Sequence, residues 1–561
     1  MLRERQTASA RRTTSRAIAL GGSGLLIALA LPATAATAAP GHPGPGDSGW
    51  GDACEDRDNK TYAKLLECVT LDGVLEHERN FQKIADDSAD PVYPGTRAAG
   101  TTGYDASADY VARLLEEAGY QVTLDPVDVT FNFPAVLRQV TPVAADYESG
   151  VFTGSGAGAV EGTVVPVDVN LTGDRASTSG CEAADFAAVD LTGDADIALI
   201  QRGTCTFGDK AFLAQQAGAE AVVIFNQGNT PDRTELFIGD ASSLTDGTVV
   251  EHAIPVVGAS FAQGEALAAP GSTAFVEVLP AETRVDHNVI AELPGRNTDN
   301  VVMAGAHLDS VIEGPGINDN GSGSSAILET ALMMANSEPQ NTIRFAWWAA
   351  EEQGLVGSAD YVAGLPQEER DRIALYMNYD MVGSPNYVQM VYDSDQSTWP
   401  APEGVTIPEG STAIEDVYES YYTAIGEPYD DAEYSGRSDY QAFIEAGIAS
   451  GGLFTGAEVV KTEEQAAIWG GTAGEAFDPC YHRECDDIDN LALDALDVNS
   501  DLIAFAMLTF SYSTESVNGV PGEPVPGKPF ELPAPAGEQG TFVEAAGGGG
   551  LDHRHDHDAV A

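Results

Sequence analysis

The feature that most constrains the fold of this chain is a regular alternation of apolar strands and helices over residues 288–381. The sequence predicts strands at Asn288–Leu293, Asn300–Gly305, Thr342–Trp348 and Ile373–Met381, and helices at Ser324–Asn336 and near Gly357–Gly364. Such alternation is typical of a sheet that is covered by helices on both faces. We therefore predict an α/β fold with a mixed, mostly parallel sheet.

Residues that can bind a metal ion stand at or near the ends of these strands and in short motifs elsewhere. They are His307, Asp319, the pair Glu351 and Glu352, Asp380, and His482. Because the carboxyl ends of strands converge on one crevice in an open α/β sheet, these side chains can meet there. Each of them alone is more often structural. Together, the two imidazoles and three of these four carboxylates form a site for two divalent ions, and zinc binds such ligands readily.

The rest of the chain divides into segments that differ in composition and in hydrophobic pattern. Leu71, Val74 and Leu75 have helical spacing, and a second predicted helix, Ala108–Ala118, is ended by Gly119 before a strand follows. Between residues 140 and 281, short β-branched runs broken by glycine and aspartate predict a separate β-rich module. The predicted parts are a signal peptide at 1–39, a leader segment at 40–70, a discontinuous main domain at 71–139 and 282–515, the inserted module at 140–281, and a Pro/Gly-rich linker with a disordered tail at 516–561.

The start of the chain and its charge indicate compartment and partners. A basic segment, an apolar run at about residues 17–31 and small residues up to 39 follow the order of a secretory signal peptide. No stretch is long and apolar enough to span a membrane, so we expect a soluble, secreted, extracellular protein. Lys+Arg 27 against Asp+Glu 87 gives a net charge of -60, which would repel a polyphosphate backbone and excludes nucleic acid as a partner. We expect a monomer.

Six cysteines in an exported chain predict disulfide bonds. Their positions group locally, as Cys54 with Cys68, Cys181 with Cys205, and Cys480 with Cys485. Other connectivities are formally open, but cross-pairing would join different parts of the chain, so we prefer the local pairs. A thiolate zinc site is the alternative, and an oxidising compartment disfavours it.

Two family resemblances emerge from these motifs. The inserted module is similar to a protease-associated domain at Ile200–Phe207, Lys210-Ala211, Gln216–Ala219 and Ile254–Val257. The main-domain motifs are Gly95–Gly100, Gly305–Asp309, Gly316–Gly321, Ala350–Gly354, Asn378–Asn386 and Asp478–His482. In this order they resemble the secreted di-zinc aminopeptidases of metallopeptidase family twenty-eight, in particular actinobacterial leucine aminopeptidases. The resemblance implies the di-zinc exopeptidase fold.

The resemblance also implies roles for single residues. One zinc ion would be held by His307, Asp380 and a bridging Asp319. The other would be held by Glu352, His482 and the same Asp319, which leaves Glu351 as the general base. Asp309 would orient the imidazole of His307, and a cis peptide is expected at Asp319-Asn320. Enzymes of this kind sometimes carry a structural calcium ion, but the sequence indicates no residues for it.

Four further residues are candidates for contact with substrate. Tyr481 lies in the short loop between Cys480 and Cys485, so its hydroxyl can be fixed toward a developing oxyanion; a packing role is the alternative. Arg437 matches a residue that assists binding of substrate or product, and an ordinary ion pair is its alternative. Met381 and Phe454 match positions that line a hydrophobic pocket, and both can equally be core residues.

These observations predict a secreted zinc aminopeptidase that hydrolyses the N-terminal residue, preferably a hydrophobic one such as Leu, from peptides and proteins with a free N-terminus. A carboxypeptidase or a glutaminyl cyclase on the same scaffold is an alternative. No Lys/Arg cluster accompanies the motifs, which speaks against a glutamate carboxypeptidase, and the full ligand set favours two ions over the single functional ion of a cyclase. A protein-binding homologue without activity is a further alternative, but such a protein would have lost ligands.

Overall fold

The computed structural model describes Cys54, residues 57–402 and residues 404–538. The predicted signal peptide, the leader up to residue 53 and the end of the tail from residue 539 lie outside the described residues. Within the described part, no helix has both the length and the apolar character needed to cross a membrane.

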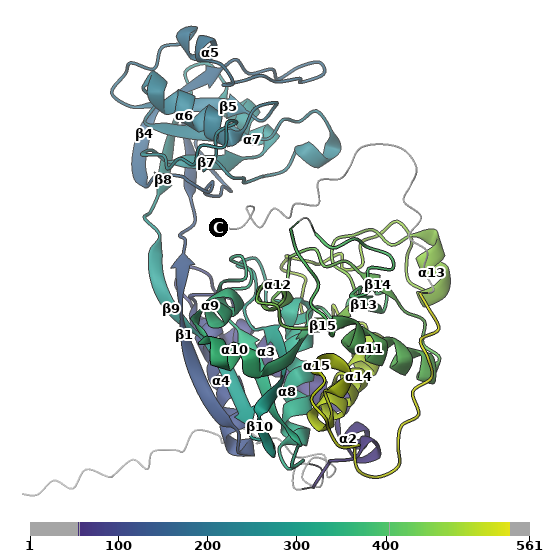
Figure 1. The fold of residues 1–561 in the computed structure, drawn as a ribbon. Helices are drawn as coiled ribbons and strands as arrows, with labels where there is room; N and C mark the ends of the chain where they lie inside the picture. The colour runs from purple at the N-terminus through teal and green to yellow at the C-terminus, as the bar shows by residue number, and fades with distance from the viewer. Residues whose placement is uncertain (1–53, 55–56, 403, 539–561) are drawn as a thin grey trace, which may run out of the picture. The chain divides into compact units, whose positions relative to one another are not determined.

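The larger sheet carries the region in which the sequence predicts alternating strands and helices (Figure 1). Its eight strands lie in the order β1-β9-β11-β10-β12-β15-β13-β14. Their bounds are β1 (Gln121–Phe131), β9 (Glu282–Leu293), β10 (Asn297–His307), β11 (Asn341–Trp348), β12 (Ile373–Tyr379), β13 (Met390–Tyr392), β14 (Asp430–Ala432) and β15 (Ser450–Phe454). Strands β11, β10, β12 and β15 are parallel to their neighbours in this series, whereas β1 and β9 form an antiparallel pair at one edge.

Helices pack on both faces of this sheet. They are α2 (Tyr62–Cys68), α3 (Leu71–Asp87), α4 (Thr102–Ala118), α8 (Gly323–Met334), α9 (Val356–Gly364), α10 (Gln367–Arg372), α11 (Ser411–Ile425), α12 (Tyr440–Glu445), α13 (Glu463–Trp469), α14 (Leu493–Tyr512) and α15 (Glu515–Asn518). Successive strand residues point to opposite faces. Val302 and Trp347 therefore join the core beneath α8 and α14, whereas Met303 and Trp348 join the core beneath α9 and α12. The predicted fold class is confirmed.

Local sequence explains where helix α4 begins and ends. The side chain of Thr101 accepts a hydrogen bond from the amide of Tyr104, which satisfies one of the free N–H groups of the first turn. The helix ends at Gly119, which takes a left-handed conformation with φ of 97°. Gly119 was the predicted stop of this helix.

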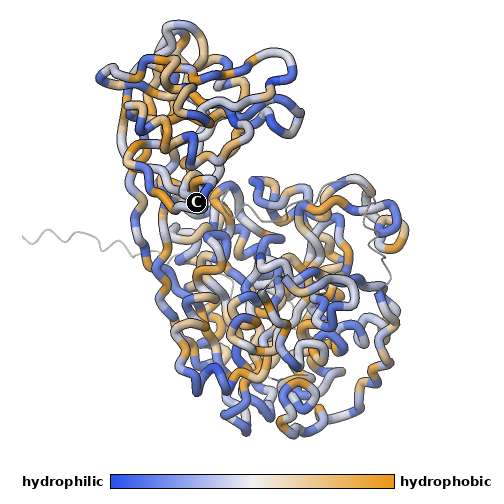
Figure 2. The backbone as a smooth tube through the Cα atoms, turned by 45° about the horizontal axis from the view of Figure 1, so that its top comes forward, coloured by the Kyte–Doolittle hydropathy of each residue, from blue (hydrophilic) through white to orange (hydrophobic). Residues whose placement is uncertain are grey.

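The inserted segment forms a second, seven-stranded sheet of its own, in the order β3-β2-β8-β4-β5-β6-β7. Its elements are β2 (Val136–Thr141), β3 (Ala145–Tyr147), β4 (Gly158–Val167), α5 (Ala183–Ala187), β5 (Asp196–Gln201), α6 (Phe207–Ala217), β6 (Ala221–Phe225), η1 (Pro231–Arg233), β7 (Val256–Ala259), α7 (Phe261–Leu267) and β8 (Thr273–Val278). Strands β5 and β6 are wholly buried. Hydrophobic stretches run through the cores of both sheets (Figure 2).

Three disulfide bonds join Cys54 to Cys68, Cys181 to Cys205, and Cys480 to Cys485, which are the local pairs preferred from the sequence. No described cysteine is free, so the alternative of a thiolate zinc site has no ligands.

The segment after α15, which the composition predicts as a linker, contacts the main core. The ring of Phe530 stacks on Tyr421 and meets Phe505 edge-on, with centroid separations of 5.6 and 4.9 Å. The amide of Glu523 donates to the carbonyl of Tyr512. This segment therefore packs on α11 and α14 at least as far as Phe530.

Candidate metal centre and active site

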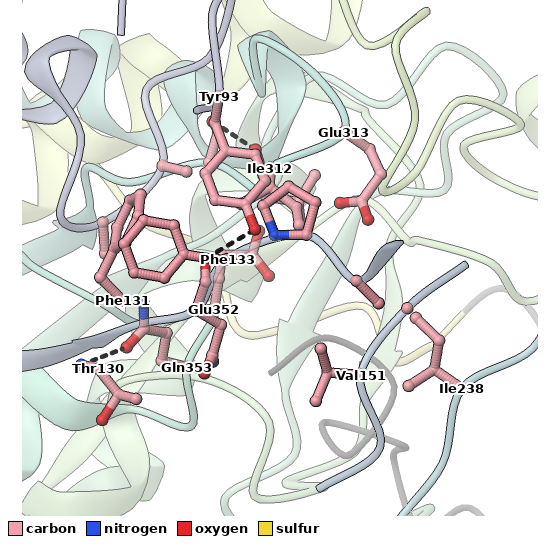
Figure 3. A pocket seen from close by; sticks show the side chains of 18 of the residues that line it. Tyr93, Thr130, Phe131, Phe133, Val151, Ile238, Ile312, Glu313, Glu352 and Gln353 are labelled. Carbon is pink, nitrogen blue, oxygen red and sulfur yellow. Dashed lines mark hydrogen bonds between the residues drawn. The ribbon is translucent and has the colours of Figure 1, made fainter. Parts of the chain in front are cut away.

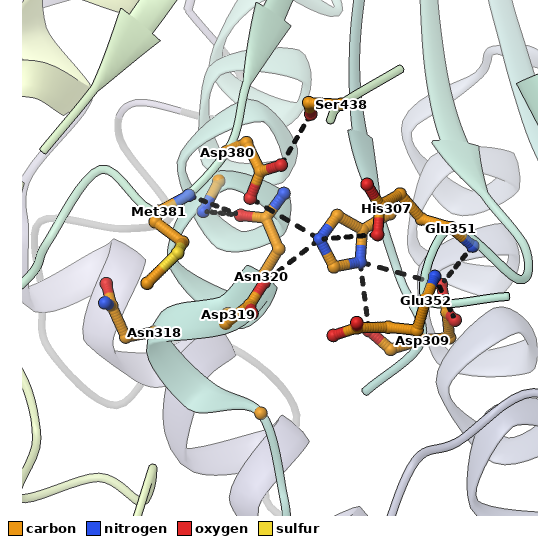
Figure 4. A network of polar contacts seen from close by, with 12 residues as sticks. His307, Asp309, Asn318, Asp319, Asn320, Glu351, Glu352, Asp380, Met381 and Ser438 are labelled. Carbon is orange, nitrogen blue, oxygen red and sulfur yellow. Dashed lines mark hydrogen bonds and ion pairs between the residues drawn. The ribbon is translucent and has the colours of Figure 1, made fainter. Parts of the chain in front are cut away.

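The residues predicted as metal ligands meet at the carboxyl ends of the central strands. Figure 4 shows them with the exception of His482. His307 is the last residue of β10, and Asp380 follows directly on β12. Glu351 and Glu352 follow β11 after two residues, and Asp319 lies in the turn segment η2 (Ile317–Ser322) that leads into α8. Parallel strands thus bring together residues that are far apart in the sequence.

The carboxylate of Asp319 lies between the two imidazoles. Its Oδ1 is 3.1 Å from Nε2 of His307, and its Oδ2 is 3.3 Å from Nε2 of His482. On one side, Asp380 Oδ1 is 3.4 Å from the same nitrogen of His307. On the other side, Glu352 Oε2 is 3.1 Å from the nitrogen of His482. The site therefore has two lobes that share Asp319.

These separations fit bound zinc. Ligand atoms around a tetrahedral ion with bonds of about 2.0–2.1 Å lie about 3.3 Å apart. In addition, Oδ1 of Asp380 and Oε1 of Glu352 are buried and have no hydrogen-bond partner among the described residues. Orphaned buried oxygens need an explanation, and a cation in each lobe supplies one. The donor set of nitrogen and carboxylate oxygen is also one that zinc accepts.

Neighbouring carboxylates raise the pKa of both histidines at the site. Burial by itself lowers the pKa of His307, but the neighbouring Glu351 and Asp380 outweigh it and raise that pKa well above its usual range. In the same way, Glu352 and Asp319 raise the pKa of His482 to about 11 despite its burial. The clustered carboxylates thus favour positive charge at both imidazoles. Metal binding would replace those protons.

Asp309 holds this region in two ways. Nδ1 of His307 lies 3.1 Å from the main-chain oxygen of Asp309 and 3.6 Å from its carboxylate, so the carbonyl is the nearer acceptor. The carboxylate accepts the amides of Glu351 and Glu352 at 3.1 and 3.3 Å. The residue expected to orient one imidazole therefore also fixes the backbone of both glutamates. The cis peptide expected at Asp319-Asn320 is present.

Two supporting residues were not identified from the sequence. Ser438 donates to Oδ2 of Asp380 at 2.5 Å and accepts from Nδ2 of the Asn378 side chain at 2.8 Å. Asp486 accepts the backbone amides of Asn318 and Asp319 at 2.8 and 3.0 Å. Both residues stand in or beside motifs that the sequence singles out, but their contacts depend on the folded geometry.

The remaining polar candidates also lie at the site. Glu351 is buried, 4.0 Å from Nε2 of His307, and burial raises its pKa well above the usual range. Arg437 donates to the hydroxyl of Tyr481 at 3.0 Å and pairs with Glu458 at 2.9 Å. The ring of Tyr481 stacks on His482. Arg437 therefore makes an ion pair and a contact to the site at once.

A pocket of about 200 Å³ opens beside Glu352 (Figure 3). The residues that line the pocket include Tyr93, Thr130, Phe131, Phe133, Val151, Ile238, Ile312, Glu313, Glu352 and Gln353. The two predicted pocket residues are not in this lining. Met381 is 3% exposed and Phe454 packs partly buried against the core beneath α12, so both contribute to the core.

Two histidines and several carboxylates at the carboxyl end of an α/β sheet are typical of metal-dependent hydrolases. Residues 288–507 match the model of peptidase family M28, and residues 160–267 match that of the PA domain. In addition, a relative that is 46% identical aligns over 81% of this chain. The chain belongs to peptidase family M28, and the resemblance found in the sequence is confirmed.

Curated relatives are aminopeptidases by name. An aminopeptidase of Pseudomonas aeruginosa is 46% identical over 464 residues, which is 81% of this chain and 83% of the relative. A probable leucine aminopeptidase 2 of Aspergillus fumigatus is 40% identical, over 75% of this chain and 80% of its own. A probable lipoprotein aminopeptidase, LpqL, of Mycobacterium tuberculosis is 39% identical, over 81% and 87%.

Solved structures agree with the fold. A zinc aminopeptidase from Bacillus subtilis superposes with a TM-score of 0.55 at 27% identity, covering 78% of this chain and 94% of that one. An aminopeptidase from Aneurinibacillus sp. strain AM-1 gives a TM-score of 0.54 at 25% identity, covering 85% and 100%.

Proposed function

We propose that this protein is a secreted, zinc-dependent aminopeptidase that removes N-terminal residues, preferably hydrophobic ones such as Leu, from peptides and proteins. The observation that carries the proposal is the position of Asp319, whose two oxygens each face a different imidazole. Asp380 and Glu352 complete the two lobes. The names of the relatives supply the reaction class, because they are aminopeptidases.

Two zinc ions would be held by the two lobes, one by His307 and Asp380, the other by His482 and Glu352, with Asp319 shared. When bound, they supply Lewis acidity for the scissile carbonyl and make a water molecule a nucleophile near neutral pH. All five ligands are buried or partly buried, so competing solvent is limited.

Glu351 is free for proton transfer, since the five other residues account for the two lobes. Its raised pKa suits a group that takes a proton from the attacking water and returns it to the leaving amine. Tyr481 would stabilise the oxyanion. Because Arg437 donates to the oxygen of Tyr481, the hydroxyl proton of that residue remains available to point toward substrate. Burial raises the pKa of Tyr481 well above its usual range, which keeps that proton in place.

The surroundings of the site fit a substrate with a free amino end. Glu313 and Glu352 line the pocket, and negative charge there favours a positively charged terminus. Apolar side chains such as Phe131 and Ile312 provide surface for a hydrophobic peptide. We retain Met381 and Phe454 as proposed neighbours of the first side chain, although both contribute to the core.

Export is supported by the three disulfide bonds, which persist in oxidising compartments. The signal peptide, the monomeric state and the absence of membrane and nucleic-acid partners stay predictions.

The test compares a chromogenic leucine anilide with its N-acetylated twin, using the full-length protein before and after chelation and zinc return. We expect cleavage of only the free-amine compound, lost on chelation and restored by zinc. The Glu351→Gln variant should keep two zinc ions per chain and lose about 10²–10⁴-fold in kcat.

Glu464→Gln is the matched control, because Glu464 is exposed on α13 and its substitution should leave activity unchanged. Equal cleavage of the blocked compound, or a fully active Glu351→Gln variant, would overturn the proposed mechanism. A zinc-loaded, folded protein that cleaves neither compound would favour the carboxypeptidase or binding-protein alternatives.

A further inference from the structure

A second group of carboxylates gathers at the edge of the larger sheet. It contains Asp393 and Asp395 from the loop after β13, Glu415 and Glu419 from one face of α11, and Asp431 from β14. Figure 1 shows the elements β13, β14 and α11. One oxygen each of Glu415, Glu419 and Asp431 lies within 4.8 Å of the others, and the same holds for Asp393, Asp395 and Glu415. We call these five residues the acidic cage. None of them belongs to the two-lobed site.

Four residues of the acidic cage are buried and only Asp395 is exposed, and the cage has no basic partner among the described residues. Glu415 is 3% exposed, Glu419 8% and Asp431 1%. No ion pair within the described part of the chain joins any cage residue to a lysine, arginine or histidine. Carboxylates are seldom buried in this way unless something compensates their charge.

One buried carboxylate oxygen of the acidic cage has no hydrogen-bond partner among the described residues, which indicates a missing ligand. Oδ1 of Asp431 is buried and has no hydrogen-bond partner among residues 57–402 and 404–538, whereas its Oδ2 accepts from the hydroxyl of Ser397 at 3.2 Å. The neighbouring Asp393 is different, because the amides of Ser397, Thr398 and Trp399 satisfy both of its oxygens. The unsatisfied oxygen thus belongs to the trio of Glu415, Glu419 and Asp431, and buried unsatisfied oxygens call for a ligand.

Protonation would be the other way to relieve the repulsion. Burial and the neighbouring carboxylates raise the pKa of Glu415 to about 9 and that of Glu419 to about 8. In the absence of a cation, these two groups would hold protons at neutral pH. A protonated Glu415 or Glu419 could donate its O–H to the buried oxygen of Asp431. The calcium titration described below therefore decides between proton uptake and cation binding.

We propose that the acidic cage binds one calcium ion through Glu415, Glu419 and Asp431. The donors are all oxygens, which favours a hard cation over zinc. Their separation of up to 4.8 Å is no more than about twice a calcium–oxygen bond of roughly 2.3–2.6 Å. Magnesium needs a tighter octahedron and keeps more of its water. Asp393, which is buried, and Asp395, which is exposed, add negative charge beside Glu415.

The ion would connect the sheet edge to the two-lobed site. Strand β14 is the last strand of the sheet and pairs with β13 over three residues. A few residues after β14, the chain supplies Arg437, which contacts Tyr481, and Ser438, which contacts Asp380. By joining α11 to β14, calcium would fix the start of that segment.

The test measures calcium binding and thermal stability, not activity. The full-length protein is dialysed into calcium-free buffer that retains zinc and is titrated with calcium chloride by calorimetry. We expect one saturable site and a rise in Tm of about 5 °C at about one hundred times Kd. Glu419→Gln should weaken calcium binding at least about tenfold and abolish most of the rise, with zinc content and circular dichroism unchanged.

Glu433→Gln is the matched control, because Glu433 lies two residues beyond Asp431, is exposed and is outside the acidic cage. If Glu419→Gln does not fold, Asp431→Asn takes its place. The proposal is wrong if the wild type shows no saturable calcium binding, or if the variant binds calcium as the wild type does. An equal rise in Tm with magnesium would overturn the assignment to calcium.

Discussion

Removing the hydroxyl of Ser438 should weaken one lobe of the metal site and spare the other. Ser438 is 5% exposed and donates to Oδ2 of Asp380 at 2.5 Å. The other oxygen of Asp380 has no hydrogen-bond partner within the described residues, so Ser438 is the side chain that orients this carboxylate. Within the described residues, the hydroxyl of Ser438 bonds to Asp380 and Asn378 and not to Glu352 or His482, which belong to the second lobe.

The size of the effect follows from this contact. A hydrogen bond to a charged group contributes about 1.5–3 kcal/mol, and each 1.4 kcal/mol is tenfold in an equilibrium constant. Loss of a residue that orients a metal ligand typically costs about 10–100-fold in affinity. We therefore expect Ser438→Ala to lower the zinc affinity of the lobe with His307 and Asp380 by about 10–100-fold.

The assay is competition with a chromogenic zinc indicator, which resolves the two dissociation steps, followed by kcat/KM at rising zinc concentration. One step should shift and the other should stay, and excess zinc should restore most activity. Ser435→Ala is the control, because Ser435 is exposed and its hydroxyl makes only a long contact, of 3.4 Å, to Tyr440 within the described residues. Equal weakening of both steps, or unchanged affinities with low activity at saturating zinc, would refute the reasoning.

Two further predictions concern other parts of the peptidase domain. In a steady-state assay, Arg437→Met should lower kcat about tenfold with little change in KM, because Tyr481 loses the donor that orients its hydroxyl. Glu458→Gln removes only the ion pair with Arg437 and should lower kcat less. Burial raises the pKa of Asp286 to about 7, although the amide of Gly100 donates to it. Between about pH 4 and pH 7 the folded protein therefore holds a proton on Asp286 that the unfolded chain releases. The contribution of Asp286 to the free energy of unfolding is fully present below about pH 4. It is lost as the pH rises to about 7, at about 1.4 kcal/mol per pH unit. Urea midpoints of wild type and Asp286→Asn across this range measure the difference, and parallel curves would contradict the prediction.

Much of the two-lobed site was predictable because it follows strand ends. His307 ends β10 and Asp380 follows β12, so knowing the strands places both residues at one edge of the sheet. The helix α14 was not predictable in the same way. It is buried nearly all round, and a helix without a polar face has no amphipathic period to detect. Its packing against β10 and β11 therefore appears only in the fold.

The acidic cage shows a second limit of the sequence. Its residues are five among 87 acidic ones, and no local motif distinguishes Glu419 or Asp431 from the acids on the surface. What distinguishes them is burial without a basic partner, which depends on how α11 meets β14. A pairing between distant elements cannot be read from composition or spacing.

Backbone conformation beside the ligands is a third feature that propensities do not reveal. Ala350, Met381 and His482 are non-glycine residues with φ of 53°, 51° and 55°, and each adjoins or is a predicted ligand or base. A left-handed conformation costs roughly 1–2 kcal/mol for such a residue, so the surrounding fold must hold it. The conformation also has a use. Adjacent side chains on a continuous strand point to opposite faces of the sheet. The turn at Ala350 follows the end of β11, so that Glu351 and Glu352 can both reach the site. The carboxylate of Asp309 then fixes the backbone amides of both glutamates.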